Sequence, residues 1–248
     1  MVKIPLLEIL IVKSYRCKYM GCDWSQPSPL LKAMSRGDLI QANEFIRRGK
    51  YLKTVDPLDA TTPLIRSMEL NQRELTRLIL DRSHDPVYLN HRNRLGNTAL
   101  HVACQLGDAE IAHLLDAKMI PRMWNICNHR GMTPIMVAID CGHEELTLNL
   151  LRNHRWDSDQ INRDGDTMFM LACRREMESV ARILVRHHQR FNYHDLQGKT
   201  VLDLAKIHEM PDIVNRIRFQ IKHPETVTID TTYLLNHSGP MSFRTDHK

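Results

Sequence analysis

The sequence predicts an all-α protein that stacks about six similar helical units into a solenoid. One short phrase recurs six times, with its copies spaced by 34, 36, 35, 34 and 33 residues. Each copy is followed by apolar residues at helical spacing. Aromatic residues make up only 6% of the chain, so the core must consist of many small aliphatic contacts, which regular helix stacking provides.

The recurring phrase marks the start of the first helix in each unit. It consists of a hydroxyl residue, a small residue or Pro in most copies, an apolar residue, and a small residue five positions after the first. A Ser or Thr can accept hydrogen bonds from the first free amides of a helix, and a following Pro fits the first helical position. The leading residues are Ser28, Thr62, Thr98, Thr133, Thr167 and Thr200.

The end of the first helix and the start of a second one follow from the next residues. Nine positions after the leading residue, the first four units have Gly or Asn, which can take the left-handed conformation that ends a helix, and the last two depart by having Glu at this position. Apolar residues then return at helical spacing, as in Ile111, Leu114 and Leu115. These helix-ending residues are Gly37, Asn71, Gly107, Gly142, Glu176 and Glu209.

A polar turn precedes the leading residue of most units. Four of these turns have Gly two positions ahead of it, at residues 93–96, 128–131, 162–165 and 195–198, and the second unit has Ala60 there instead. Such sequences are hairpin turn signals. We therefore expect a hairpin-like finger before each of these first helices.

The chain resembles the ankyrin-repeat family, whose unit is a β-turn finger followed by two antiparallel helices. The signature is fullest in residues 96–103 and 131–138. The resemblance covers about residues 26–218, with repeats starting near 26, 60, 96, 131, 165 and 198, and the last copy, with Asp203, looks like a closing repeat. Residues 1–25 are then an N-terminal extension and residues 219–248 a flexible C-terminal tail.

Charge and cysteine content narrow the classes of partner and compartment. The chain has 34 basic and 29 acidic residues, and residues 26–218 hold 27 and 24 of them, so direct binding of nucleic acid is not expected. Six cysteines are too sparse for a disulfide scaffold and favour a reducing compartment, the cytoplasm or the nucleus. The apolar run over residues 4–12 is too short to cross a membrane.

Motifs that carry chemistry are incomplete. Cys17 and Cys22 could supply half of a zinc site, but the next His is at position 84, so ordinary thiols are favoured. Residues 198–200 imitate the end of a phosphate-binding loop but lack its first glycine. His101 and Cys104 lack a third, orienting group. We therefore expect no catalytic residue, no metal, no cofactor and no small-molecule substrate.

The fingers supply the candidate binding residues. Stacked fingers would align Arg92, Arg94, Arg130 and Arg163 in a basic row able to hold carboxylates or phosphates; the alternative is that these arginines are simply solvated. Two connections, residues 82–89 and 117–124, are longer than the others. The second contains Met123 and Trp124, which are either exposed anchors for a partner or packing between the loop and its helices.

The resemblance implies a non-enzymatic module that binds a protein partner on the concave surface formed by the fingers and first helices. Rigid stacked repeats offer a preorganised surface, which limits the ordering entropy lost on association. The module would serve as a scaffold or adaptor in signalling. The alternative is an inhibitory κB-like protein that masks a Rel/NF-κB-type transcription factor, since six repeats with long connections around the third are similar to that group.

Overall fold

The computed structural model describes residues 26–83, 85–118, 124–153, 156–158, 160–187 and 191–223, which are almost entirely helices and turns. Within these ranges β-structure is limited to isolated bridges, at Ile161 with Thr167 and His194 with Thr200. The inner helices are α2 (Pro29–Arg36), α4 (Pro63–Glu69), α7 (Ala99–Leu106), α9 (Pro134–Asp140), α11 (Met168–Arg174) and α13 (Val201–Ile207). The outer helices are α3 (Leu39–Arg47), α5 (Arg73–Arg82), α8 (Ala109–Asp116), α10 (Glu144–Asn153), α12 (Glu178–His187) and α14 (Pro211–Lys222).

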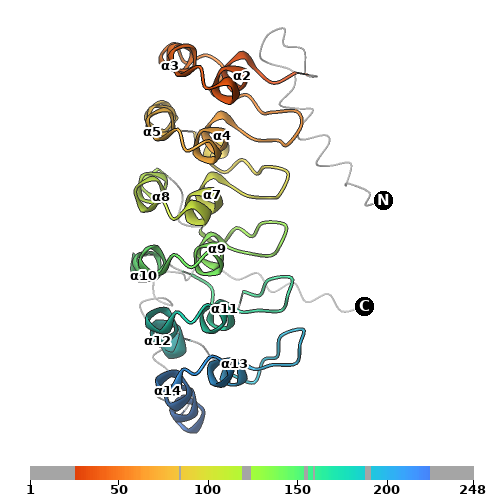
Figure 1. The fold of residues 1–248 in the computed structure, drawn as a ribbon, viewed down its shortest axis with the longest axis vertical. Coiled ribbons are helices and arrows are strands. Elements are labelled where there is room, and N and C mark those ends of the chain that lie inside the picture. The colour runs from red at the N-terminus through yellow and green to blue at the C-terminus, as the bar shows by residue number, and fades with distance from the viewer. Residues whose placement is uncertain are drawn as a thin grey trace, which may run out of the picture.

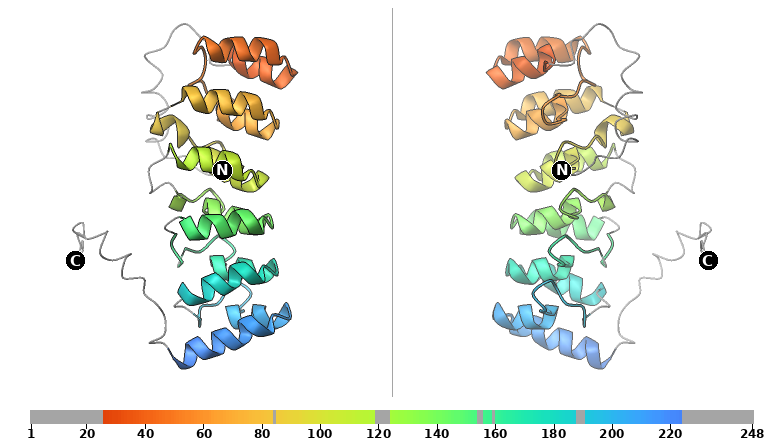
Figure 2. Two further views of the ribbon diagram at one scale, coloured as in Figure 1. Left: turned by 90° about the vertical axis from the view of Figure 1, so that its left-hand side faces the viewer. Right: turned by 90° about the vertical axis from the view of Figure 1, so that its right-hand side faces the viewer.

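The helices form two parallel columns, and the fingers project sideways from the inner column (Figure 1). Side views show the same pairs stacked one above the other along the long axis (Figure 2). A short additional helix, α6 (Pro86–Leu89), occupies the connection between the second and third units. The predicted all-α solenoid is confirmed, with its units in sequence order.

The leading hydroxyl residues start the inner helices as the phrase predicts. The side-chain oxygen of Thr62 accepts a hydrogen bond from the backbone N–H of Ile65 at 3.3 Å, and Thr133 and Thr167 do the same for Met136 and Met170. Each bond satisfies one amide that has no partner within the helix. The phrase therefore fixes where the inner helices begin.

The residues that end the inner helices are left-handed even where they are not glycine. Gly107 has φ +69°, and a Cβ there would lie 2.6 Å from the imidazole of His143, so no side chain fits without a shift. Asn71, Glu176 and Glu209 also have positive φ, at 55°, 56° and 51°. A left-handed non-glycine residue costs about 1–2 kcal/mol, which these units must offset by packing.

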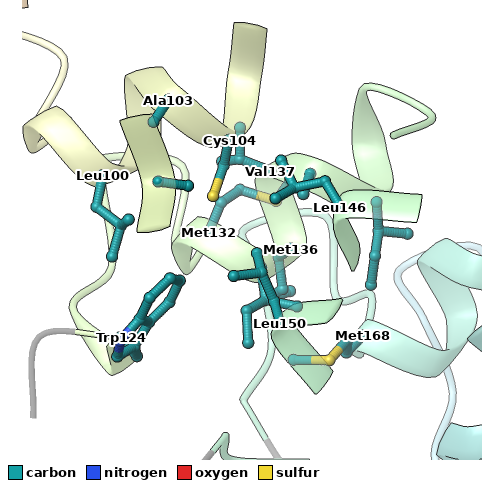
Figure 3. Packing of buried hydrophobic residues seen from close by; sticks show 14 of the residues in the cluster. Leu100, Ala103, Cys104, Trp124, Met132, Met136, Val137, Leu146, Leu150 and Met168 are labelled. Carbon is teal, nitrogen blue, oxygen red and sulfur yellow. The ribbon is translucent and has the colours of Figure 1, made fainter. Parts of the chain in front are cut away.

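The core consists of aliphatic and methionine side chains from neighbouring units. Leu100 and Cys104 of α7, Met132, Val137 of α9, Leu146 of α10 and Met168 belong to one buried cluster (Figure 3). Methionine fills irregular gaps between helices because its side chain is unbranched and flexible. The small residue five positions into each phrase is buried, and in the third to sixth units it is a fully buried alanine: Ala103, Ala138, Ala172 and Ala205.

The last outer helix continues past residue 218, where the sequence places the end of the array. Ile213, Val214 and Ile217 are buried and anchor α14, and the helix ends at Lys222, two residues before Pro224. A proline disfavours helical geometry in the residue before it. Residues 1–25, with Cys17 and Cys22, and residues 224–248 lie outside the described residues.

Candidate protein-binding surface

In the third to sixth units the finger is closed by one side chain five positions before the leading residue. In the third unit this is Asn93, whose Oδ1 accepts hydrogen bonds from the N–H groups of Leu95 and Asn97, both at 3.0 Å. Its own N–H donates to the carbonyl of Asn97 at 2.9 Å. The equivalent side chains in the next three units, Asn128, Asn162 and Asp195, make the same pair of bonds. The fingers are therefore rigid turns with a common geometry.

A ladder of backbone hydrogen bonds joins each finger to the next. The N–H of His129 donates to the carbonyl of Leu95 at 3.0 Å, and the N–H of Arg163 donates to the carbonyl of Arg130 at 2.9 Å. The close approach depends on glycine, because a Cβ at Gly96 would lie 2.8 Å from the backbone nitrogen of His129. In the same ladder the backbone N–H of Arg94 donates to the carbonyl of Asp59 at 2.8 Å, and the N–H of Leu196 donates to the carbonyl of Asp164 at 3.4 Å.

The two arginines of the third finger bind carbonyl oxygens. The Nη2 of Arg92 donates to the carbonyl of Cys127 in the next finger at 2.9 Å, and its Nε donates to Gly96. The Nη1 of Arg94 donates to the carbonyl of Leu58 in the preceding finger at 3.2 Å. Both arginines are exposed. Because a carbonyl carries no net charge, their positive charges are not neutralised by these contacts.

Arg130 and Arg163 differ in their electrostatic surroundings. The Nη1 of Arg130 lies 3.4 Å from Oδ2 of Asp140, and its Nη2 lies 4.0 Å from Oδ2 of Asp164. Arg163 is exposed, and within the described ranges its side chain has no hydrogen bond or ion pair. The basic row is therefore uneven, because Arg130 lies beside two carboxylates, the nearer of which it shares with Arg175.

Ion clusters connect the inner helices to the fingers in the second and fifth units. Arg66 of α4 pairs with Asp59, lies 3.5 Å from Asp56 and donates to Glu69 at 3.0 Å. Burial opposes ionisation of Asp59, but hydrogen bonds from Thr61 and Arg66 outweigh it and lower the pKa of this carboxyl. Burial raises the pKa of Glu69. This end of the surface carries more acidic than basic groups.

The fifth unit contains a second such cluster, centred on Arg174. Its Nε donates to Asp166 at 3.0 Å, and its Nη2 pairs with the buried Asp195 of the next finger. Burial raises the pKa of Asp166, although Arg174 partly opposes this. The arginine thus binds two successive fingers, and its charge is compensated.

The interpretation of Trp124 as an exposed anchor is wrong. Its side chain is 2% exposed, and its indole Nε1 donates to Oδ1 of Asp116 at 2.8 Å. The ring belongs to the same buried cluster as Leu100 of α7 and Met136 of α9 (Figure 3). Met123 lies outside the described residues, so its role remains a prediction.

His101 and Cys104 are core residues. The Nε2 of His101 lies 3.0 Å from the carbonyl of Met132, and its Nδ1 accepts from the N–H of Thr98 at 3.2 Å. Burial lowers the pKa of His101 to about 4, and burial raises the pKa of the Cys104 thiol. A neutral, fully bonded imidazole beside a protonated thiol joins two units and is not arranged as a nucleophile with its base.

Sequence reasoning missed the leucines at the finger tips. Leu58 and Leu196 are 72% and 78% exposed, and Leu95 is exposed as well. The period of the phrase contains the signal, because Leu58 and Leu196 stand four positions before Thr62 and Thr200, where Arg94 and Arg163 stand before their own leading residues. Apolar and basic side chains therefore share one edge of the molecule.

The comparison with protein families decides the identity of these units. The family model described as ankyrin repeats in three copies matches residues 3–120, 87–160, 118–195 and 135–225. The chain belongs to the ankyrin-repeat family. The ankyrin fingers and helix pairs of the structure correspond to the unit that the sequence phrase predicts, and ankyrin repeats form a protein–protein interaction module.

Known ankyrin proteins match parts of this chain. Neurogenic locus notch homolog protein 1 of Mus musculus is 33% identical over 117 residues, which are 47% of this chain and 4% of that protein. The solved ankyrin-repeat protein EF0377 is 23% identical with a TM-score of 0.64 over 76% of this chain and 96% of its own. The ankyrin domain of Bcl-3, described as a member of the IkappaB family, is 24% identical with a TM-score of 0.59 over 77% and 86%.

Two classes of site do not occur among the described parts of the ankyrin array. No three His, Cys, Asp or Glu side chains there group closely enough to hold a metal ion. No helix in the same ranges has the length and apolarity needed to span a bilayer.

Proposed function

We propose that this ankyrin protein is a non-enzymatic adaptor or scaffold that binds a protein partner along its concave face, in the cytoplasm or nucleus. The observation that carries the proposal is the pair of exposed arginines, Arg92 and Arg94, whose hydrogen bonds go to carbonyl oxygens. Their charges stay available to an acidic partner. Arg163, which has no carboxylate partner among the described residues, adds a third.

Rigidity of the fingers supports this choice of surface. The side-chain turns and the backbone ladder fix the positions of the arginines before a partner arrives. Preorganised groups lose less conformational entropy on binding, and a guanidinium can bind a carboxylate through two parallel hydrogen bonds. Arg130 contributes less because Asp140 and Asp164 already lie beside it.

Affinity capture from the native cell with the full chain tests the proposal. We expect the partners bound by the natural protein to be lost with the double variant Arg94→Glu and Arg163→Glu, since two charges are reversed. Arg186→Glu, at an exposed position on the outer helix α12, is the matched control and should retain them. Equal capture by all three proteins would reject the fingers as the binding surface, provided that their thermal unfolding midpoints agree.

Only the fold supports the inhibitory κB-like alternative, because the ankyrin domain of Bcl-3 has 24% sequence identity to this chain. A direct binding measurement with a purified Rel/NF-κB-type factor separates the two functions. Binding that excludes DNA from the factor would favour the inhibitor, whereas simultaneous binding of two different captured proteins would favour the adaptor.

A further inference from the structure

The exposed edge of the fingers has a distinct order of side chains. We define the tip row as the residues four positions before each leading residue from the second unit onward: Leu58, Arg94, His129, Arg163 and Leu196. All five are exposed. Apolar residues thus stand at both ends of the row and basic residues stand between them.

The backbone ladder fixes the distance between successive members of this row. Going from Arg94 to His129 takes one step along the chain to Leu95 and one step across the hydrogen bond of 3.0 Å that joins Leu95 to His129. Neighbouring Cα atoms lie about 3.8 Å apart along the chain and about 5 Å apart across a strand-like hydrogen bond. The row therefore advances by about 9 Å per unit, close to the spacing of about 8–10 Å between packed helices.

The charge of the row favours an acidic partner. The guanidinium of Arg94 binds the uncharged carbonyl of Leu58, and that of Arg163 has no carboxylate partner in the described part of the chain. Two carboxylates stand next to members of the row, and each already lies near another arginine. Asp59, after Leu58, pairs with Arg66, and Asp164, after Arg163, lies 4.0 Å from Arg130. A positive centre with apolar ends remains.

We propose that the tip row binds an extended acidic segment of a partner protein, with a carboxylate at every third residue and an apolar residue at each end. In the extended polyproline II conformation a segment has three residues per turn and advances about 3.1 Å per residue, so side chains three residues apart lie on one face and are separated by about one unit of the array. The inference rests on the proposed function and specifies the partner that the fingers select.

The register follows from matching the spacing of carboxylates along the ligand to the spacing of the tip row along the array. Carboxylates three residues apart meet Arg94, His129 and Arg163 in turn, while the apolar ends meet Leu58 and Leu196. A helical segment advances only about 1.5 Å per residue, so it would need its carboxylates six or seven residues apart. The spacing of acidic residues therefore discriminates between an extended and a helical ligand.

Synthetic peptides test the register with the full chain. One thirteen-residue peptide has leucine at both ends and glutamate at every third position between them, and a second has the same composition with its glutamates adjacent. We expect the spaced peptide to bind about tenfold more tightly, because each bidentate carboxylate contact is charge-assisted. Arg163→Gln and Leu196→Ser should each weaken its binding several-fold, and added salt should weaken it further.

Arg186→Gln is the matched control for the loss of one arginine, and it should leave peptide binding unchanged. Equal affinity for the two isomers, tighter binding of a helical peptide with its glutamates seven residues apart, or no binding of any peptide would each overturn the inference. If the peptides fail while Arg94→Glu with Arg163→Glu still abolishes partner capture, the proposed function stands and only the register falls. Thermal unfolding of Arg163→Gln and Leu196→Ser checks that both variants are folded.

Discussion

At the scale of single residues, His101 shows how one side chain joins two repeats. The carbonyl of Met132 can only accept, so Nε2 of His101 carries the hydrogen and Nδ1 accepts from Thr98. Protonation of Nδ1 would break the bond to the N–H of Thr98. In the last described unit Asp203 takes the equivalent position and accepts from the N–H and hydroxyl of Thr200.

The pKa of His101 makes stability depend on pH. The folded protein holds this pKa at about 4, against 6.5 for an ordinary histidine. As pH falls below 6.5 the unfolded chain takes up a proton that the folded chain does not bind, so stability declines until about pH 4. The total loss from this residue is about 3 kcal/mol.

Urea unfolding at a series of pH values measures this effect. His101→Gln should reduce the slope of unfolding free energy against pH between 6.5 and 4 by up to about 1.4 kcal/mol per unit. His113→Gln, at an exposed position on α8, controls for the removal of one imidazole. Identical slopes for the natural protein and His101→Gln would show that this histidine does not couple folding to protonation.

At the scale of elements, α6 supports a helix of the preceding unit. Its Tyr88 is buried, and the phenolic oxygen accepts a hydrogen bond from the N–H of Leu64 at 3.3 Å, near the start of α4. Burial raises the pKa of Tyr88. Lys53 pairs with Asp85, just before α6, at 2.8 Å. The longer connection between the second and third units therefore contributes structure to its neighbours.

Removal of one oxygen tests this contribution. Tyr88→Phe leaves the N–H of Leu64 buried without its partner, so we expect a loss of about 1–3 kcal/mol in the free energy of unfolding. Tyr193→Phe, in the finger of the last unit and only partly buried, should cost less than half of that. A stability unchanged by Tyr88→Phe would mean that water or a shifted side chain satisfies the amide.

Local sequence rules predicted the elements but not the contacts between them. The leading threonine, the helix-ending position and the finger glycine each act within one unit, so one repeat of the phrase suffices to place a helix pair. Arg92 and Arg130 have the same local signature as solvated turn residues, and only the tertiary structure decides that Arg92 meets a carbonyl beside the next finger and Arg130 a carboxylate on α9 of its own unit. Trp124 was ambiguous for the same reason, because its packing depends on helices outside its own loop.

At the scale of the whole molecule, stability comes from contacts between adjacent units. Each inner helix packs on its neighbouring inner helices, and among the outer helices α3 packs on α5, α5 on α8, α10 on α12 and α12 on α14 (Figure 2). Ion pairs such as Arg77 with Glu110 at 2.7 Å and Arg182 with Asp212 at 2.9 Å cross the same boundaries on the exposed outer face, where water and salt screen their attraction. Apolar packing between neighbours is therefore the main coupling.

Because each unit is coupled mainly to its neighbours, the same isoleucine-to-alanine replacement should affect different regions when it is made at the end and in the middle of the array. Ile213 of α14 and Ile135 of α9 are both fully buried, and replacement of either by alanine removes about 2–5 kcal/mol of packing. We expect Ile213→Ala to reduce hydrogen-exchange protection in α13 and α14 and to leave α4 and α7 protected, because a terminal unit can open alone. Ile135 lies in a unit with neighbours on both sides, so Ile135→Ala should reduce hydrogen-exchange protection from α7 to α11. Equal loss of protection along the whole array in Ile213→Ala would instead show that the solenoid unfolds as a single cooperative unit.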